Sequence, residues 1–326
     1  MKGLSKPAVV RHKIGDDSDG QRVDNYLLRI CKGVPKSHIY RILRSGEVRV
    51  NSKRIGPDYR LQLDDEVRVP PIQMSAEKSG PAIPHGQDFD IVFEDEALLV
   101  IDKPAGMAVH GGSGVSFGVI EQLRRQRPEA RFLELVHRLD RETSGLLIIA
   151  KKRSALTALH DMFREGRIEK RYLAMVKGRW TDILRHVKSP LLKYLTAEGE
   201  RRVSVSPEGK VAHSIVRLWI RWQNFSLVEV ELKTGRTHQI RVHLTHLGFP
   251  LCGDDKYGDF PLNKVLQKQG LGRMFLHAAK LIFQHPLTGE RIELAAALPP
   301  ELINFVLRLE KNESREYGTE VSVDRL

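Results

Sequence analysis

The sequence has few cysteines and no long apolar run, and both absences narrow what the protein can be. Cys31 and Cys252 are the only cysteines among 326 residues, too few for a disulfide framework or a cysteine-rich zinc site. No stretch approaches the roughly 18 apolar residues of a membrane-spanning helix. Because Lys2 and Lys6 are not followed by an apolar stretch, we expect no secretory signal peptide and a cytoplasmic protein.

Acidic side chains are also in short supply. The chain has 53 Lys and Arg against 41 Asp and Glu, a formal net charge of +12 and a pI near 9.7. A protein this basic commonly meets a polyanion, nucleic acid above all, although charge that serves only solubility gives the same balance. Residues 1–73 contain 15 Lys and Arg against 9 Asp and Glu, so half of the net charge lies in less than a quarter of the chain.

Several common nucleotide-binding and catalytic motifs are missing. The glycines of residues 111–118 do not fit G-x-G-x-x-G, and the chain contains neither a P-loop nor a G-x-S-x-G segment. The histidines of residues 238–246 are clustered, but a metal site would need a further cysteine or carboxylate at a fitting distance. We therefore expect no small-molecule cofactor and no metal ion.

Residues 20–73 carry the pattern of a small basic module. Apolar residues recur at helical spacing from Val23, and Ser37 is a suitable N-cap for a second helix that ends at Arg44. Short alternations of valine with charged residues follow and predict strands. This order resembles the S-four-like RNA-binding module, although a small α/β appendage without a ligand would show the same pattern. The candidate RNA-contacting side chains of the module are Arg41, Arg44, Arg49, Lys53 and Arg54.

The remaining chain predicts a larger α+β domain. Apolar runs of strand length alternate irregularly with three predicted helices, Ser154–Arg164, Thr237–Leu247 and Pro299–Leu309. Because no strict βαβ order is present, we expect a mixed or antiparallel sheet. The predicted organisation is a basic flexible tail (1–19), the small module (20–73), a linker (74–87), the large domain (88–312) and a polar, frayed tail (313–326).

The most informative segment is residues 136–145, V-H-R-L-D-R-E-T-S-G. It joins two apolar, strand-like runs and places one carboxylate, Asp140, between Arg138 and Arg141. A carboxylate held in a loop beside cations is ionised at neutral pH and can act as a base or a nucleophile. A purely structural Asp–Arg turn explains the same residues, so the segment alone leaves both interpretations open.

The run H-R-L-D-R-E-T-S-G resembles the signature of the RluA-type pseudouridine synthases. Other segments are similar to that family in the same order: K-P-A-G at 103–106 with His110, K-R-Y at 170–172, T-G-R-T-H-Q-I-R at 234–241, and F-L-H-A at 275–278. The resemblance runs from Arg22 to about Leu309. It is strongest to the branch that acts on several uridines of large-subunit ribosomal RNA.

The resemblance implies a pseudouridine synthase catalytic domain, a 23S ribosomal RNA substrate and no cofactor. It assigns the essential carboxylate to Asp140, which would attack the sugar, attack the ring or remove a sugar proton. Arg236 is implied to pair with Asp140. Tyr172 is implied to stack on the uracil and to bring a phenolic oxygen near the ring carbon that loses its proton. Arg138 would fill the space that the flipped uridine leaves, and Leu276 would form a wall of the pocket.

Each assignment has a plainer alternative. Tyr172 and Leu276 could be ordinary core residues, and Arg236 could be a surface arginine. For the whole chain, the competing function is a non-catalytic RNA-binding or ribosome-assembly factor on the same fold. A glycoside hydrolase or nuclease would need a second placed carboxylate or metal ligands. We expect RNA, either free or in an assembling large subunit, as the partner of a monomer that does not bind membranes.

Overall fold

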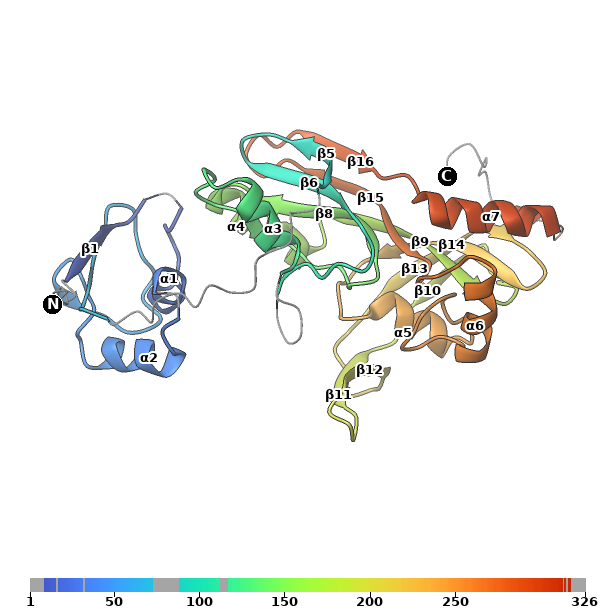
Figure 1. Cartoon of the computed structure of the whole chain (residues 1–326), viewed down its shortest axis with the longest axis horizontal. Coiled ribbons are helices and arrows are strands. Elements are labelled where there is room, and N and C mark those ends of the chain that lie inside the picture. Colours follow the sequence, from blue (N-terminus) through green and yellow to red (C-terminus); the bar gives the residue numbers. More distant parts are fainter. Residues whose placement is uncertain are drawn as a thin grey trace, which may run out of the picture. The chain divides into compact units, whose positions relative to one another are not determined.

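The computed structural model describes residues 9–15, 17–31, 33–72, 88–111, 117–312, 314, 316 and 317. The chain separates into two compact units, residues 1–86 with 128–132 and residues 87–127 with 133–326 (Figure 1). The predicted linker, 74–87, lies outside the described residues. Within the described part, no helix has the length and apolar character needed to cross a bilayer.

The described residues of the small unit form a four-stranded antiparallel sheet with two helices. Its elements are β1 (Val10–Lys13), α1 (Val23–Ile30), α2 (Lys36–Arg44), β2 (Arg49–Val50), β3 (Lys53–Arg54) and β4 (Glu66–Val69), and the sheet order is β1-β4-β2-β3. Ile39, Ile42 and Leu43 of α2 are buried in the core of this unit, whereas Arg41 and Arg44 on the opposite face are exposed. The amphipathic spacing read from the sequence therefore sets the orientation of α2.

The structure corrects two predictions for the small unit. Val10–Lys13 were expected in a flexible tail but form β1, in register with β4 from Val10↔Val69 to Lys13↔Glu66. The predicted N-cap, Ser37, lies inside α2, which begins at Lys36 after Pro35. Pro35 has the extended backbone of a cap residue and fixes φ by its ring, so it sets the helix start without a side-chain hydrogen bond.

The large unit is built on one large sheet, mostly antiparallel. Its main path runs β10 (Leu184–Val187), β13 (Ser214–Arg221), β14 (Phe225–Leu232), β9 (Glu169–Lys177), β15 (Leu276–Gln284), β8 (Ser144–Ala150), β6 (Leu98–Lys103) and β5 (Asp90–Glu94). Three further strands pair with strands inside this path: β7 (Glu134–Leu135) with β8, β16 (Arg291–Ala295) with β15, and β17 (Glu316–Tyr317) with β13. Sheet and helices together confirm the predicted α+β class.

Five helices and a separate hairpin accompany the main sheet in the described part of the large unit. The helices are α3 (Val119–Gln126), α4 (Arg153–Glu165), α5 (Gln239–His246), α6 (Phe260–Lys268) and α7 (Pro300–Asn312). The hairpin of β11 (Leu191–Leu195) and β12 (Arg201–Val205) is a two-stranded sheet that projects away from the main sheet in Figure 1. Glu316–Tyr317, predicted to be frayed, pair with Ile220 and Arg221 of β13.

The only parallel contact among the described strand pairs is the one between β8 and β15. It joins Ser144 to His277 and Gly145 to Ala278. Gly145 has φ +110°, and a Cβ there would lie 2.3 Å from the carbonyl oxygen of Ala278, so only glycine permits this approach. The pairing places the end of the D-R-E-T-S-G segment directly beside the first residues of β15.

Candidate active site

Asp140 lies in the segment between β7 and β8, where two cavities adjoin. Their volumes are about 640 Å³ and 440 Å³. Both cavities are lined by His110, Arg138, Leu139, Asp140, His238 and Arg241. The larger one is also lined by Tyr172, Arg236 and Leu276, so all five catalytic and pocket residues expected from the sequence border the same space.

The buried Lys103 and the partly buried Arg273 hold the loop that carries Asp140 in place. Nζ of Lys103 donates to the carbonyl oxygen of Arg141 at 3.2 Å, to that of Pro104 in its own K-P-A-G segment at 2.7 Å and to that of Met107, the next residue after the segment, at 2.9 Å. Nη2 of Arg273 donates to the carbonyl oxygen of Glu142 at 3.3 Å and to Oγ of Ser144 at 2.8 Å. The backbone is thus held on the C-terminal side of Asp140, and its own carbonyl accepts from the amide of Thr143 at 3.1 Å.

The lysine of the K-P-A-G segment is fully buried, and its charge is weakened there. Burial and the neighbouring Arg273 lower the pKa of Lys103 to about 7, against the pull of nearby carboxylates. Its amine therefore works mainly as a hydrogen-bond donor to carbonyl oxygens. The lysine of the K-P-A-G motif therefore has a structural role, because it binds the backbone of the loop that carries Asp140.

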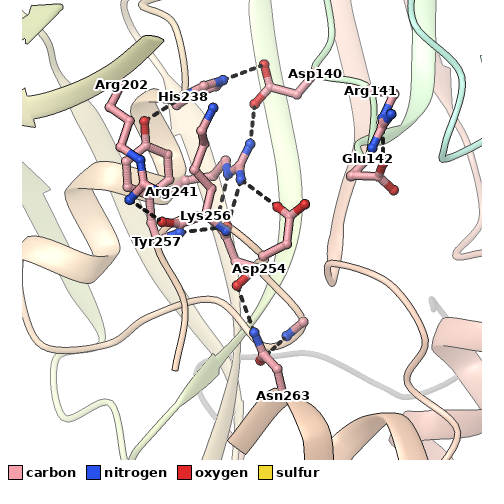
Figure 2. Close-up of polar contacts among 12 residues, drawn as sticks. Asp140, Arg141, Glu142, Arg202, His238, Arg241, Asp254, Lys256, Tyr257 and Asn263 are labelled. Carbon is pink, nitrogen blue, oxygen red and sulfur yellow. Dashed lines mark hydrogen bonds and ion pairs between the residues drawn. The ribbon is translucent and has the colours of Figure 1, made fainter. Parts of the chain in front are cut away.

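The cation that reaches the candidate carboxylate is Arg241, in the first turn of α5 (Figure 2). Its side chain is 6% exposed and makes two 2.7 Å hydrogen bonds to the fully buried Asp254. Its Nη1 lies 3.4 Å from Oδ2 of Asp140. Burial opposes the charge of Arg241, but the bonds and charge of Asp254 outweigh it and raise the arginine pKa. Because Asp254 fixes the guanidinium plane, Nη1 is held facing Asp140.

The structure corrects the predicted ion pair between Arg236 and Asp140. Arg236 is exposed, and its Nε donates to the carbonyl oxygen of Val211 at 3.0 Å. Its backbone amide is held by Oε1 of Gln239 at 3.0 Å. Arg236 precedes α5 and is exposed, whereas Arg241 lies in the first turn of that helix, where residues 239–244 are all buried. This difference in burial decides which of the two arginines reaches Asp140.

His238 is a second group beside Asp140 that we did not predict. Its Nε2 lies 3.9 Å from Oδ1 of Asp140, and its Nδ1 lies 2.8 Å from the hydroxyl of Tyr257 (Figure 2). Burial lowers the pKa of His238, so the ring is neutral at pH 7. A signal was available in the sequence, because His238 and Arg241 belong to the same T-G-R-T-H-Q-I-R run and sit three residues apart, on one side of a helix start.

Tyr172 and Leu276 line the larger cavity from adjacent strands, β9 and β15. Tyr172 is 8% exposed, and burial together with the charge of Asp140 raises its pKa. The hydroxyl therefore stays protonated at neutral pH, which favours stacking and hydrogen bonding and disfavours a phenolate base. Lys170, also in this cavity, has its pKa lowered to about 8 by burial and by Lys233.

The two arginines that flank Asp140 in the sequence do not bind it. Nε of Arg141 donates to Glu142 at 2.8 Å. Arg138 is exposed at the rim shared by the two cavities, and its side chain forms no hydrogen bond or ion pair to the residues that the structure describes. A free guanidinium at this rim is compatible with the predicted contact with RNA, which stays a prediction.

The predicted RNA-contacting side chains of the small unit, Arg41, Arg44, Arg49, Lys53 and Arg54, are all exposed. Nη1 of Arg41 lies 3.6 Å from a carboxylate oxygen of Glu47. Arg44 and Arg49 donate to backbone carbonyls at 3.3 and 3.4 Å, and Arg54 binds the carbonyl of Arg44. These contacts leave most of the donors of these side chains open to a ligand. In the described residues, no group of three or more His, Cys, Asp or Glu is placed to hold a metal ion.

Comparison with known proteins identifies the family. The model of the RNA pseudouridylate synthase family matches residues 97–246, and that of the S4 domain matches residues 21–67. Ribosomal large subunit pseudouridine synthase C of Pasteurella multocida (strain Pm70) is 51% identical over 312 residues, 94% of this chain and 96% of that protein. The protein of the same name from Escherichia coli (strain K12) is 52% identical over 310 residues, 93% of this chain and 97% of that protein.

The chain belongs to the RluA-type family of RNA pseudouridine synthases. Solved pseudouridine synthase structures agree with the fold. Human RNA pseudouridylate synthase domain containing 1 matches with a TM-score of 0.58 and 25% identity over 75% of this chain and 94% of that one. Human RNA pseudouridylate synthase domain containing 4 matches with a TM-score of 0.56 and 26% identity over 68% and 93%. The resemblance drawn from the motifs is thereby confirmed, and RNA is the partner of the family.

Proposed function

We propose that this pseudouridine synthase isomerises specific uridines of 23S ribosomal RNA, at several sites. The observation that carries the proposal is one carboxylate, Asp140, held by Arg241 in a cavity with the buried phenol of Tyr172. The high identity to proteins named ribosomal large subunit pseudouridine synthase C supports large-subunit RNA as the substrate.

The reaction breaks the bond between the uracil nitrogen and the sugar, turns the base and joins it to the sugar through carbon. Because no oxidation state changes, the reaction needs no oxidant or reductant. Breaking and remaking the bond to the sugar needs a correctly placed carboxylate and a site that retains the detached base. In our proposal Asp140 is that carboxylate, Tyr172 stacks on the uracil and Leu276 closes the wall. Arg138 at the rim enters the space that the flipped nucleotide vacates.

We also propose that a single chain acts in the cytoplasm, where ribosomal RNA is made and assembled. One chain carries every side chain of the site described above. Sedimentation of the purified protein with and without RNA tests the monomer. A stable dimer that is required for activity would contradict it.

The deciding experiment is pseudouridine mapping on unmodified 23S RNA incubated with the purified enzyme. The wild type should form pseudouridine at a few defined positions, and Asp140→Asn should form none while its RNA affinity stays within about twofold, because Asn keeps the shape but is no base or nucleophile. A wild type that binds RNA without forming pseudouridine would favour the alternative, a non-catalytic assembly factor. Activity of Asp140→Asn near the wild-type rate would remove Asp140 from its role.

A further inference from the structure

Tyr257 contacts His238 and Arg241, the two side chains that face the carboxylate of Asp140. Its hydroxyl is 2.8 Å from Nδ1 of His238, and its ring lies under the guanidinium of Arg241, 5.1 Å from ring centroid to Cζ. His238 faces Oδ1 of Asp140 at 3.9 Å, and Arg241 faces Oδ2 at 3.4 Å (Figure 2). One aromatic side chain thus supports the neighbours of both carboxylate oxygens.

The hydrogen bonds around Tyr257 favour one direction for its proton. The backbone amide of Val203 lies 3.0 Å from the tyrosine oxygen and can only donate to it. The hydroxyl proton is therefore available to Nδ1 of His238, which accepts it when the ring carries its own proton on Nε2. In a neutral imidazole with Nδ1 as acceptor, the remaining proton sits on Nε2, the nitrogen that faces Asp140.

The backbone at His238 is strained in a way that serves this contact. His238 is the N-cap residue of α5 and has φ 52° and ψ 22°, in the left-handed region that few residues other than glycine adopt, although asparagine, aspartate and histidine do so more often than the rest. Its side chain is 16% exposed and lines both cavities. An unfavourable backbone conformation persists where surrounding contacts stabilise it, and the hydrogen bond to Tyr257 is one of the contacts that stabilise His238.

Burial is the main reason that the ring of His238 stays neutral. Burial disfavours the imidazolium, and Arg241 and Lys256 add to this, whereas Asp140 and Asp254 act in the opposite direction. At neutral pH the uncharged ring of His238 therefore presents its Nε2–H group to Asp140. The distance of 3.9 Å is longer than a hydrogen bond, and such contacts commonly tighten when substrate binds.

The far end of this chain of contacts lies in the β11–β12 hairpin. Val203 is buried in β12 and packs with Leu191, Ala212 and Val242 in a small core that Tyr257 joins. Nη1 of Arg202 donates to the carbonyl of Lys256 at 3.2 Å, beside Tyr257. The position of the hairpin is therefore transmitted to Tyr257 through a backbone amide and through packing.

We propose that Tyr257 is a positioning residue for the isomerisation, which holds His238 as an Nε2–H donor toward Asp140, keeps Arg241 in place and ties both to the β11–β12 hairpin. The proposal rests on the proposed function, since it assigns a task within the same site. Tyr257 itself acts through His238 and Arg241 and needs no contact with substrate.

The first test needs no RNA. In nitrogen-15 NMR of the full-length protein at pH 7, His238 should show a hydrogen-bonded, unprotonated Nδ1 and a protonated Nε2. In Tyr257→Phe the Nδ1 resonance should lose its hydrogen-bond shift, and the pKa of His238 should rise, because the missing donor stabilised the neutral ring. A protonated Nδ1 in the wild type would overturn the proposal, since Tyr257 would then accept rather than donate.

The second test measures single-turnover pseudouridine formation. Tyr257→Phe should slow the reaction about tenfold, the equivalent of one neutral hydrogen bond, while RNA affinity stays within about twofold. His238→Asn keeps an acceptor near the Nδ1 position and tolerates the left-handed backbone, but lacks Nε2, so its rate should fall by a similar factor. The double variant should be no slower than His238→Asn alone, because the hydroxyl of Tyr257 affects the rate through the Nε2 contact with Asp140 that His238→Asn already removes.

Additive effects in that cycle, or a wild-type rate for Tyr257→Phe, would contradict the proposal. Tyr59→Phe is the matched control, because it removes a phenolic hydrogen bond to Asp65 in the small unit, and its rate should equal that of the wild type. Melting temperatures of all variants show whether a slow rate reflects a damaged fold. If the wild type formed no pseudouridine, the proposed function would fail, whereas the NMR result would still report the state of His238.

Discussion

Arg41 and Arg44 of the small unit and Arg241 of the large unit are placed in opposite ways. In the small unit Arg41 and Arg44 are exposed and make only weak contacts with their own chain. In the large unit Arg241 is 6% exposed and faces Asp254, Asp255 and Asp140. An exposed cation adds little to stability and acts at a distance on a polyanion, subject to salt. A buried and paired cation fixes geometry, and its removal leaves charges without partners.

The largest expected effect comes from the buried side of this comparison. Arg241→Lys keeps the charge but cannot form the two parallel bonds to Asp254, so Asp140 no longer has a fixed neighbour. Removing such a charge-assisted hydrogen bond, worth about 3 kcal/mol, should lower the rate of pseudouridine formation by about 100-fold. The measurement is single-turnover kinetics on 23S RNA with circular dichroism as the check on folding. Arg236→Lys is the matched control, and a decrease as large as that of Arg241→Lys would restore the pairing we rejected.

Substitutions of the buried Tyr172 should have the next largest effect. Tyr172→Leu should weaken binding of a flipped-uridine analogue by about 10- to 100-fold, since stacking on an aromatic ring is worth about 1–3 kcal/mol per base. Tyr172→Phe should bind the analogue normally and stall after the base has detached if the hydroxyl serves in proton transfer at the ring carbon. Wild-type turnover by Tyr172→Phe would leave the ring alone as the functional part. Because Tyr172 is buried, melting temperatures must be compared first.

Substitutions of the exposed Arg41 and Arg44 should have a smaller effect, which appears in the salt dependence of RNA binding. Arg41→Gln with Arg44→Gln should reduce RNA affinity and lower the slope of log affinity against log salt, by about 0.7–0.9 for each RNA phosphate that the variant no longer binds. The melting temperature should not change, because both side chains are exposed. Lys152→Gln, which removes an exposed cation paired to Glu96 in the large unit, is the control. An unchanged salt slope in binding titrations would show that α2 does not touch RNA.

The smallest expected effect concerns stability rather than activity. Burial and the nearby Arg273 lower the pKa of His277 to about 4, although its bond to the carbonyl of Ala296 opposes this. Between pH 6.5 and 4 the unfolded chain takes up a proton at this residue before the folded chain does, so stability falls as pH falls through that range. The decrease in the free energy of unfolding should amount to about 1–2 kcal/mol between about pH 7 and 5. Denaturant titrations of the wild type and His277→Gln measure it, and equal pH dependence would refute it.

The sequence predicted most of the elements whose pattern is local. The predicted helix Ser154–Arg164 appears as α4 and the predicted helix Pro299–Leu309 as α7, because helical periodicity depends only on neighbouring residues. Helix α6 was missed although its signal was readable. Asp259 caps it, accepting from the amide of Leu262 at 3.0 Å, and a proline follows in the first turn.

The site was predicted in part, for a physical reason. Asp140 stands out because a single motif contains it, and its cavity gathers Tyr172 and Leu276 as expected. The choice between Arg236 and Arg241 depends on where α5 begins and which face it buries, and residue types alone do not show this. Tyr257 was missed because its contact with Val203 joins segments 54 residues apart, and only the folded chain brings these together.

Strand β15 has a consequence for how the enzyme is made. In the main sheet it lies between β9 and β8, so it joins one half built from β9, β13 and β14 to another built from β5, β6 and β8. Both halves precede β15 in the chain, and until residues 276–284 leave the ribosome each presents an unpaired strand edge. Such edges invite pairing with other chains. The nascent protein therefore completes its catalytic unit only after both halves have been made, and a ribosome stalled before that point would carry an aggregation-prone, inactive half-sheet.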